Sequence, residues 1–228
     1  MSTDEYRSSA LFYDYCISPL LKGVRRDIRT YINYKGYKRV IDFCCGTGDQ
    51  LRLLDRPGMS LCGIDNSLAM LEQARRNCSN TVDLHLLDAE HDRIGSDSFD
   101  CAIISFSLHE KHPAVADTIF KNSRKIIRQG GSLILADYAT IPSTFPGKAY
   151  GSFLIPFIER LAGTTHNEHY RGWMQQGALE GFLGKQHSGC EIISRPFARA
   201  ALCCAISIDD DIRSKISSYD LLNQALQS

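Results

Sequence analysis

Short apolar segments alternate with helical patterns through the first two thirds of the chain. Two of them, RVIDFCC (39–45) and MSLCGID (59–65), are apolar or β-branched and end at glycine or acidic residues, which is typical of buried strands. Three further predicted strands continue the series: VDLHLLD (82–88), FDCAIISFS (99–107) and GSLILADY (131–138). Between them, 67–78 follows a helical pattern capped by Ser67, and 112–131 carries an apolar stripe with Gly130 as its helix stop. The alternation predicts an α/β fold with a doubly wound, mainly parallel sheet whose ligand lies at the carboxyl ends of the strands.

The pattern changes after the fifth predicted strand. Residues 141–187 carry prolines, glycines, aromatic residues and several histidines, and we interpret them as an inserted helical cover. Residues 190–208 predict an antiparallel hairpin that turns near Arg195 to Arg199 and closes the edge of the sheet. The tail, 209–228, is expected to be a helix with disordered ends.

Composition narrows the class of protein. With 228 residues, of which 43% are hydrophobic, the chain is expected to form a single domain. The 26 basic and 26 acidic residues balance, so no global field attracts nucleic acid or an anionic membrane surface. The sequence contains no apolar run of the roughly 20 residues that a membrane span needs, and its start lacks a secretion signal. We therefore expect a soluble, cytoplasmic protein whose nine cysteines are reduced thiols.

The first predicted strand leads into Asp42-Phe43-Cys44-Cys45-Gly46-Thr47-Gly48, a glycine turn that lets a ligand approach the backbone. A dinucleotide fingerprint requires a further glycine where Leu51 stands, and a phosphate loop requires a following Gly-Lys-Ser/Thr. Adjacent cysteines point to opposite faces of a strand and there is no C-x-x-C pair, so we predict no metal site. The remaining interpretation is a nucleoside pocket, because Asp65 lies about 20 residues on, where a ribose-binding acid belongs.

On these residues the chain resembles the class I S-adenosylmethionine-dependent methyltransferases, and within them the small ubiquinone/menaquinone C-methyltransferase-like (methyltransferase type 11) proteins. The resemblance extends over 40–138 and more loosely over the N-terminal region and 168–183. It implies a Rossmann-like fold with a cofactor-binding core over 38–139, an N-terminal helical lid over 1–35, and a substrate cover over 141–187.

The resemblance also implies which residues bind S-adenosylmethionine. The glycine turn contacts the methionine and ribose parts, Asp65 accepts both ribose hydroxyls, and the end of the third strand contacts adenine. The alternatives are that Asp65 caps a helix, that Asp42 only receives N–H groups of the turn, and that Met70 belongs to the core. The full predicted set is Asp42, Cys44, Gly46, Thr47, Gly48, Asp65, Asn66, Met70, Asp88, Ala89 and Ser105.

Methyl transfer is an in-line displacement, so the protein chiefly aligns the acceptor, and hydroxyl or carbon acceptors also need a base. His109 follows the fourth strand and is our first candidate, with Tyr138 and His169 as further catalytic candidates. The alternative for His109 is a ring satisfied by loop backbone, and the aromatic residues of the cover could simply pack on the core. The predicted substrate contacts are Tyr13, Glu110, His166, Tyr170 and Arg171.

The predicted function is therefore transfer of a methyl group from S-adenosylmethionine to the carbon, oxygen or nitrogen atom of a small molecule. The segment after the fourth strand, SFSLHE, lacks the proline-containing motif of enzymes that modify base amines, which argues against a nucleic-acid methyltransferase. A protein methyltransferase and a non-catalytic S-adenosylmethionine-binding protein remain alternatives, because no single residue is obligatory for the displacement. The oligomeric state and the acceptor are not predicted.

Overall fold

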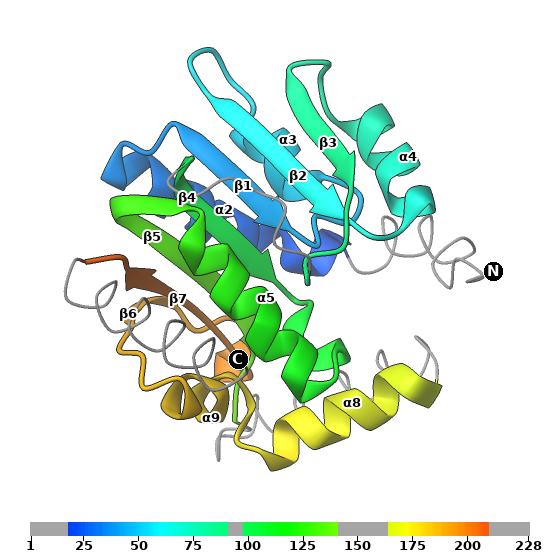
Figure 1. The fold of residues 1–228 in the computed structure, drawn as a ribbon, viewed down its shortest axis with the longest axis vertical. Coiled ribbons are helices and arrows are strands. Elements are labelled where there is room, and N and C mark those ends of the chain that lie inside the picture. Colours follow the sequence, from blue (N-terminus) through cyan, green and yellow to red (C-terminus); the bar gives the residue numbers. More distant parts are fainter. Residues whose placement is uncertain (1–17, 91–97, 141–163, 210–228) are drawn as a thin grey trace, which may run out of the picture.

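The computed structural model describes residues 18–90, 98–140 and 164–209 and contains a single seven-stranded sheet in the order β3-β2-β1-β4-β5-β7-β6 (Figure 1). The first five strands in this order are parallel, and β7 is antiparallel to both β5 and β6. The fold class and the closing hairpin are thus confirmed. The strands are β1 (Arg39–Phe43), β2 (Ser60–Asp65), β3 (Val82–Leu86), β4 (Phe99–Ser105), β5 (Ile127–Tyr138), β6 (Glu191–Ser194) and β7 (Ala201–Ser207).

Helices cover both faces of the sheet. Two separate apolar cores show this arrangement, one containing side chains of α5, α8 and α9, and the other containing side chains of α2, α3 and α4. The helices are α2 (Ser18–Lys35), α3 (Asp49–Leu54), α4 (Leu68–Asn77), α5 (Pro113–Lys125), α8 (Thr164–Gln175) and α9 (Ala178–Lys185), with 3₁₀ turns η2 (Leu108–Glu110) and η4 (Phe197–Arg199). The helical part of the predicted cover is therefore present as α8 and α9.

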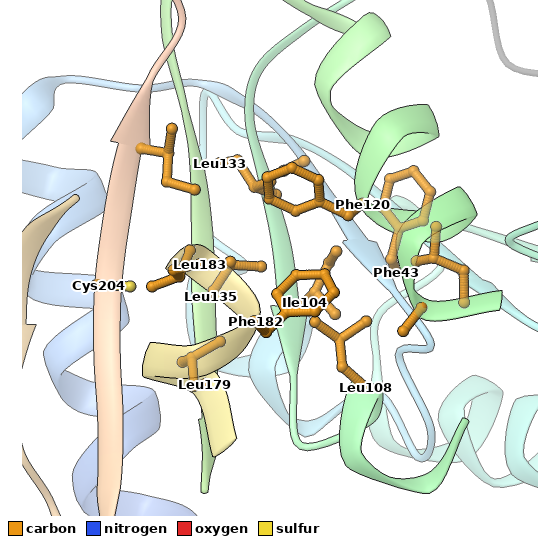
Figure 2. Packing of buried hydrophobic residues seen from close by; sticks show 14 of the residues in the cluster. Phe43, Ile104, Leu108, Phe120, Leu133, Leu135, Leu179, Phe182, Leu183 and Cys204 are labelled. Carbon is orange, nitrogen blue, oxygen red and sulfur yellow. The ribbon is translucent and has the colours of Figure 1, made fainter. Parts of the chain in front are cut away.

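The core on the α5 side is closely packed. Figure 2 shows Phe120 of α5 and Phe182 of α9 meeting over Leu133 and Leu135 of β5, and their ring centroids lie 5.4 Å apart at 87°. Cys204 of β7 belongs to this core, whereas the adjacent Cys203 belongs to the other one. The adjacent cysteines therefore point to opposite faces, as the alternation of side chains along a strand requires.

Two local predictions can be compared directly with the structure. Ser67 caps α4, since its Oγ accepts a hydrogen bond from the backbone N–H of Met70 at 3.3 Å. The predicted helix end at Gly130 is wrong, because α5 ends at Lys125 and β5 begins at Ile127. The four residues before Gly131 extend the strand instead, with a register shift where β5 pairs with β4 between Phe99 and Cys101.

None of the helices within the described ranges is long and apolar enough to cross a membrane.

Candidate active site

The glycine turn between β1 and α3 has the backbone geometry that only glycine adopts easily. Gly46 and Gly48 have φ angles of 54° and 77°. A Cβ on Gly48 would lie 2.7 Å from Cys78 Sγ and 3.1 Å from Ala74 Cβ, so α4 packs directly on the turn there. A Cβ on Gly46 would meet nothing within 4 Å. The turn is therefore closed toward α4 at Gly48 and open at Gly46.

Asp65 ends β2 beside this turn. Its Oδ2 accepts a hydrogen bond from the backbone N–H of Gly46 at 2.8 Å, and its Oδ1 accepts one from Ser67 at 2.9 Å. Burial raises the pKa of the Asp65 carboxyl, and these two N–H groups oppose the shift without cancelling it. Each carboxylate oxygen can accept a second hydrogen bond, so the group can still receive two hydroxyl donors.

Asp65 lines a small pocket that is partly open to solvent, at the carboxyl ends of β1, β2 and β3. The apolar lining comes from Leu87, Ala89, Val115 and Ile119, which suits a flat heterocycle. Polar groups surround it: Asn66, Asp88, Glu90 and Lys111, with Cys44 at the base. The side chain of Lys111 is a lining group that the sequence analysis missed.

The ammonium of Lys111 lies 3.1 Å from Glu110 Oε1. Burial by itself lowers the pKa of Lys111, but the Glu110 carboxylate, aided by Asp65, raises it by more, so the pKa lies above its usual value. Burial also raises the pKa of the Cys44 thiol to about 12, which leaves it protonated and unreactive. This agrees with reading the cysteines as apolar filler.

The residues present fit S-adenosylmethionine. Within the described ranges, four buried side-chain oxygens near the turn and the end of β4 have no hydrogen-bond partner: Asp42 Oδ1, Thr47 Oγ1, Gln50 Oε1 and Ser107 Oγ. Buried polar atoms are nearly always satisfied, so unpaired acceptors next to an open backbone indicate a polar ligand with donors, such as an ammonium group. Together with Asp65 and the apolar pocket, they match the polar and apolar parts of a nucleoside that carries an amino-acid side chain on its 5′ sulfur.

A histidine and a carboxylate form a buried pair where β4 and β5 end. His109 Nδ1 lies 2.7 Å from Asp137 Oδ1, and the two residues are 4% and 1% exposed. Asp137 also accepts three backbone N–H bonds, from Leu108 at 3.1 Å, from His109 at 3.3 Å and from Tyr138 at 2.7 Å. Because a carboxylate only accepts, Nδ1 carries the hydrogen, and Nε2 is the nitrogen that can take a proton.

Aromatic rings surround this pair. The ring of Tyr138 lies 4.6 Å from that of His109 and 5.5 Å from that of Tyr170, centroid to centroid. Phe106 contacts Tyr138 at 5.6 Å and Phe197 at 6.1 Å. We call His109, Tyr138, Tyr170, Phe106 and Phe197 the aromatic cluster. It brings together the segment after β4, which contains η2, with β5, α8 and η4.

Helix α8 supplies three predicted residues with different positions. Tyr170 is buried at 4% exposure and packs edge-on against Tyr138, whereas Arg171 is exposed. His169 Nδ1 lies 2.7 Å from the backbone carbonyl oxygen of Glu110, so α8 is joined to the turn η2 just past β4 (Figure 1). His166 falls in α8, but its side chain lies outside the described part, as does Tyr13.

The other predicted residues divide between the pocket and its surroundings. Asn66, Asp88 and Ala89 line the pocket with Asp65 and Cys44. Ser105 ends β4 and pairs with Ala136, and Met70 is buried on α4. In the sequence, Asp137 could be recognised only as an acid at the end of a predicted strand. Its hydrogen bond to His109 was not predicted.

Comparisons with known proteins identify similar sequences and similar folds. Residues 40–131 match the methyltransferase domain family. A demethylmenaquinone methyltransferase from Beutenbergia cavernae is 31% identical over 157 residues, which cover 64% of this chain and 63% of that protein. The chain thus matches less than two thirds of the length of this relative.

Two solved structures share the fold. A candidate S-adenosylmethionine-dependent methyltransferase from Methanococcus maripaludis aligns with a TM-score of 0.61 at 16% identity, over 92% of this chain and 96% of that chain. Human N-acetylserotonin methyltransferase, solved in complex with S-adenosylmethionine, aligns with a TM-score of 0.62 at 12% identity, over 90% of this chain and 57% of that chain. At these identities the likeness concerns the fold.

Proposed function

We propose that this chain is a class I S-adenosylmethionine-dependent methyltransferase that methylates a hydroxyaromatic small molecule at a ring carbon or a hydroxyl oxygen. Its match to the methyltransferase domain family over residues 40–131 and its fold support this proposal. The observation that carries the proposal is the buried His109–Asp137 pair inside the aromatic cluster. The name of the Beutenbergia relative, a quinone methyltransferase, points to the same acceptor class.

The cofactor would be held by the residues around the glycine turn. When bound, S-adenosylmethionine supplies an electrophilic methyl group on a sulfonium. Asp65 would accept the ribose hydroxyls, because charge-assisted hydrogen bonds from two hydroxyls satisfy the lone pairs that Gly46 and Ser67 leave. The unpaired oxygens of Asp42, Thr47 and Gln50 would accept donors of the methionine part.

The chain's own chemical step is removal of a proton from the acceptor. A hydroxyl oxygen, or a ring carbon activated by one, forms its new bond to the methyl group more readily as its proton leaves. His109 Nε2 takes this proton, and the imidazolium that results is stabilised by the carboxylate of Asp137 at 2.7 Å. An amine acceptor would need no such base, so the pair favours carbon or oxygen acceptors.

The proposal is tested by methyl incorporation from labelled S-adenosylmethionine. Reduced 1,4-naphthoquinone and catechol represent hydroxyaromatic acceptors, and RNA, DNA and a histone mixture represent the rival classes. We expect incorporation into the hydroxyaromatic acceptors and a fall in turnover of about 10²-fold or more in His109→Gln, which is the usual contribution of a general base. Incorporation only into a polymer, or full activity of His109→Gln with saturating cofactor, would contradict the proposal.

A non-catalytic role is distinguished by the same protein preparation. Calorimetry would show whether S-adenosylmethionine and S-adenosylhomocysteine bind. Binding without incorporation into any acceptor of the panel would favour a cofactor-binding protein that has kept the fold.

A further inference from the structure

Phe106 and Phe197 occupy a special position in the packing. They are the two residues in the described ranges that pack against both apolar cores. The cores lie on opposite faces of the sheet, so a side chain that touches both lies at the sheet's margin, either beyond the end of the strands or at an edge strand. Phe106 directly follows β4, and Phe197 belongs to η4, which leads into β7 beside the end of β5. Both rings therefore lie at the edge where the candidate active site is built.

Both phenylalanines are held in an unfavourable backbone conformation. Phe106 has a φ of 50°, and Phe197, Ala198 and Arg199 form a run with φ of 53°, 50° and 76°. A bulky residue at positive φ is a genuine outlier, and strain of this kind persists where the surrounding structure enforces it and gathers at functional sites.

Hydrogen bonds hold the strained backbone in place. The N–H of Phe106 donates to the carbonyl oxygen of Ala136 in β5 at 2.8 Å. The η4 turn is closed by Arg199 N–H to Pro196 O at 3.0 Å, and Ala139 N–H joins Ala200 O at 3.0 Å next to it. A glycine would adopt this backbone geometry without strain, so the backbone geometry does not by itself require phenylalanine at these positions. The arrangement fixes where the two rings lie.

The rings adjoin the proton-accepting pair without contributing polar atoms of their own. Phe106 and Phe197 meet edge to face at 6.1 Å, and Phe106 meets Tyr138, the ring next to His109, at 5.6 Å. Both are half-buried, so part of each ring surface is open. An apolar, partly open wall beside a base suits a flat, electron-rich acceptor whose hydroxyl points to the base.

We propose that Phe106 and Phe197 form the specificity wall of the acceptor site and select a flat aromatic ring over an aliphatic or purely polar acceptor. This assignment rests on the function proposed above and adds to it the residues that choose the acceptor. The wall acts on binding of the acceptor, whereas Asp65 and the glycine turn act on binding of the cofactor.

Binding is measured on the full chain saturated with S-adenosylhomocysteine, so that no turnover is needed. The probe is 1,4-dihydroxynaphthalene, the reduced form of 1,4-naphthoquinone, and its affinity is read from quenching of the single tryptophan, Trp173, whose indole N–H lies 3.4 Å from the carbonyl oxygen of Tyr138. We expect Phe106→Leu and Phe197→Leu each to raise the Kd of the probe by roughly three- to tenfold, the loss of one aromatic contact. Phe99→Leu, at the opposite end of β4, is the matched control and should stay within twofold.

Folding defects are separated from loss of the wall by two further measurements. The affinity for S-adenosylhomocysteine should be unchanged in all three leucine variants. Phe197→Gly removes the ring and at the same time relieves the strain at φ 53°, so it should fold and still lose affinity for the probe.

The two levels of the proposal fail differently. The specificity wall is overturned if the affinity for the probe stays within twofold of wild type in both Phe106→Leu and Phe197→Leu. It is also overturned if the wild-type protein binds S-adenosylhomocysteine but no hydroxyaromatic or quinone probe. If the wild type binds the probe as expected and transfers no methyl group to any acceptor, the proposed function is overturned instead.

Discussion

Replacing Asp137 by asparagine tests how much the hydrogen bonds to its carboxylate contribute to stability. The two oxygens of Asp137 accept four N–H groups, two on each oxygen. An asparagine keeps one oxygen and places an NH₂ group where the other stood, so in either orientation two donors lose their acceptor. The residue is 1% exposed, so water cannot replace it. A stranded buried donor costs about 1–3 kcal/mol, so the free energy of unfolding should fall by about 2–6 kcal/mol.

Asp42→Asn is the matched control. Asp42 is also a buried acid of the central sheet, at 2% exposure, but its Oδ1 has no hydrogen-bond partner within the described part of the chain. The same chemical change there strands no donor that the structure shows bound. The free energy of unfolding of Asp42→Asn at pH 7.5 should equal or exceed that of the wild type.

Urea unfolding at pH 7.5, followed by circular dichroism, gives both free energies. We expect a large fall in the midpoint for Asp137→Asn at an unchanged slope, and none for Asp42→Asn. Equal midpoints for wild type and Asp137→Asn would refute the reasoning, since the four bonds to Asp137 would then not contribute to stability. A loss of the same size in Asp42→Asn would show that any buried acid of this sheet responds alike.

Three further predictions concern the cofactor pocket and its acids. Gly46→Ala should weaken S-adenosylmethionine binding at least tenfold in calorimetry, because the new Cβ would enter the open side of the turn. Gly58→Ala is the control, since Gly58 also has a positive φ and open space around it. This control should change only stability, by about 1 kcal/mol. Asp65→Asn should raise the Kd for the cofactor tenfold or more, whereas the control Asp83→Asn, at an exposed position of β3, should leave it unchanged. A change within twofold for Asp65→Asn would exclude the contact with the ribose. Burial raises the pKa of Asp42 from 3.8 to about 8, so the folded state binds the proton of Asp42 more tightly than the unfolded state does. The free energy of unfolding of the wild type should therefore fall relative to that of Asp42→Asn as the pH rises from about 4 to 8. Parallel curves of stability against pH for the two proteins would contradict this.

Local signals in the sequence were enough to predict the strands and the glycine turn. Strands and helices have distinct periods, and the predicted strands overlap β1 to β7, although β5 begins at Ile127 and not at Gly131. The positive φ of Gly46 and Gly48 and the cap at Ser67 depend on neighbouring residues only. The one helix end that was predicted wrongly, at Gly130, lies where strand pairing between β4 and β5 overrides a local stop signal.

The tertiary structure alone decided which side chains of the active site meet. Asp137 lies 28 residues from His109, and their bond depends on the register in which β5 pairs with β4. The contact of Phe106 with Phe197 depends on the hairpin that brings η4 to the end of β5. Lys111, which follows β4, lines the pocket of Asp65, which ends β2, and only β1 lies between these two strands in the sheet. Such contacts join residues distant in the chain, and no periodicity along the sequence encodes the distance between them.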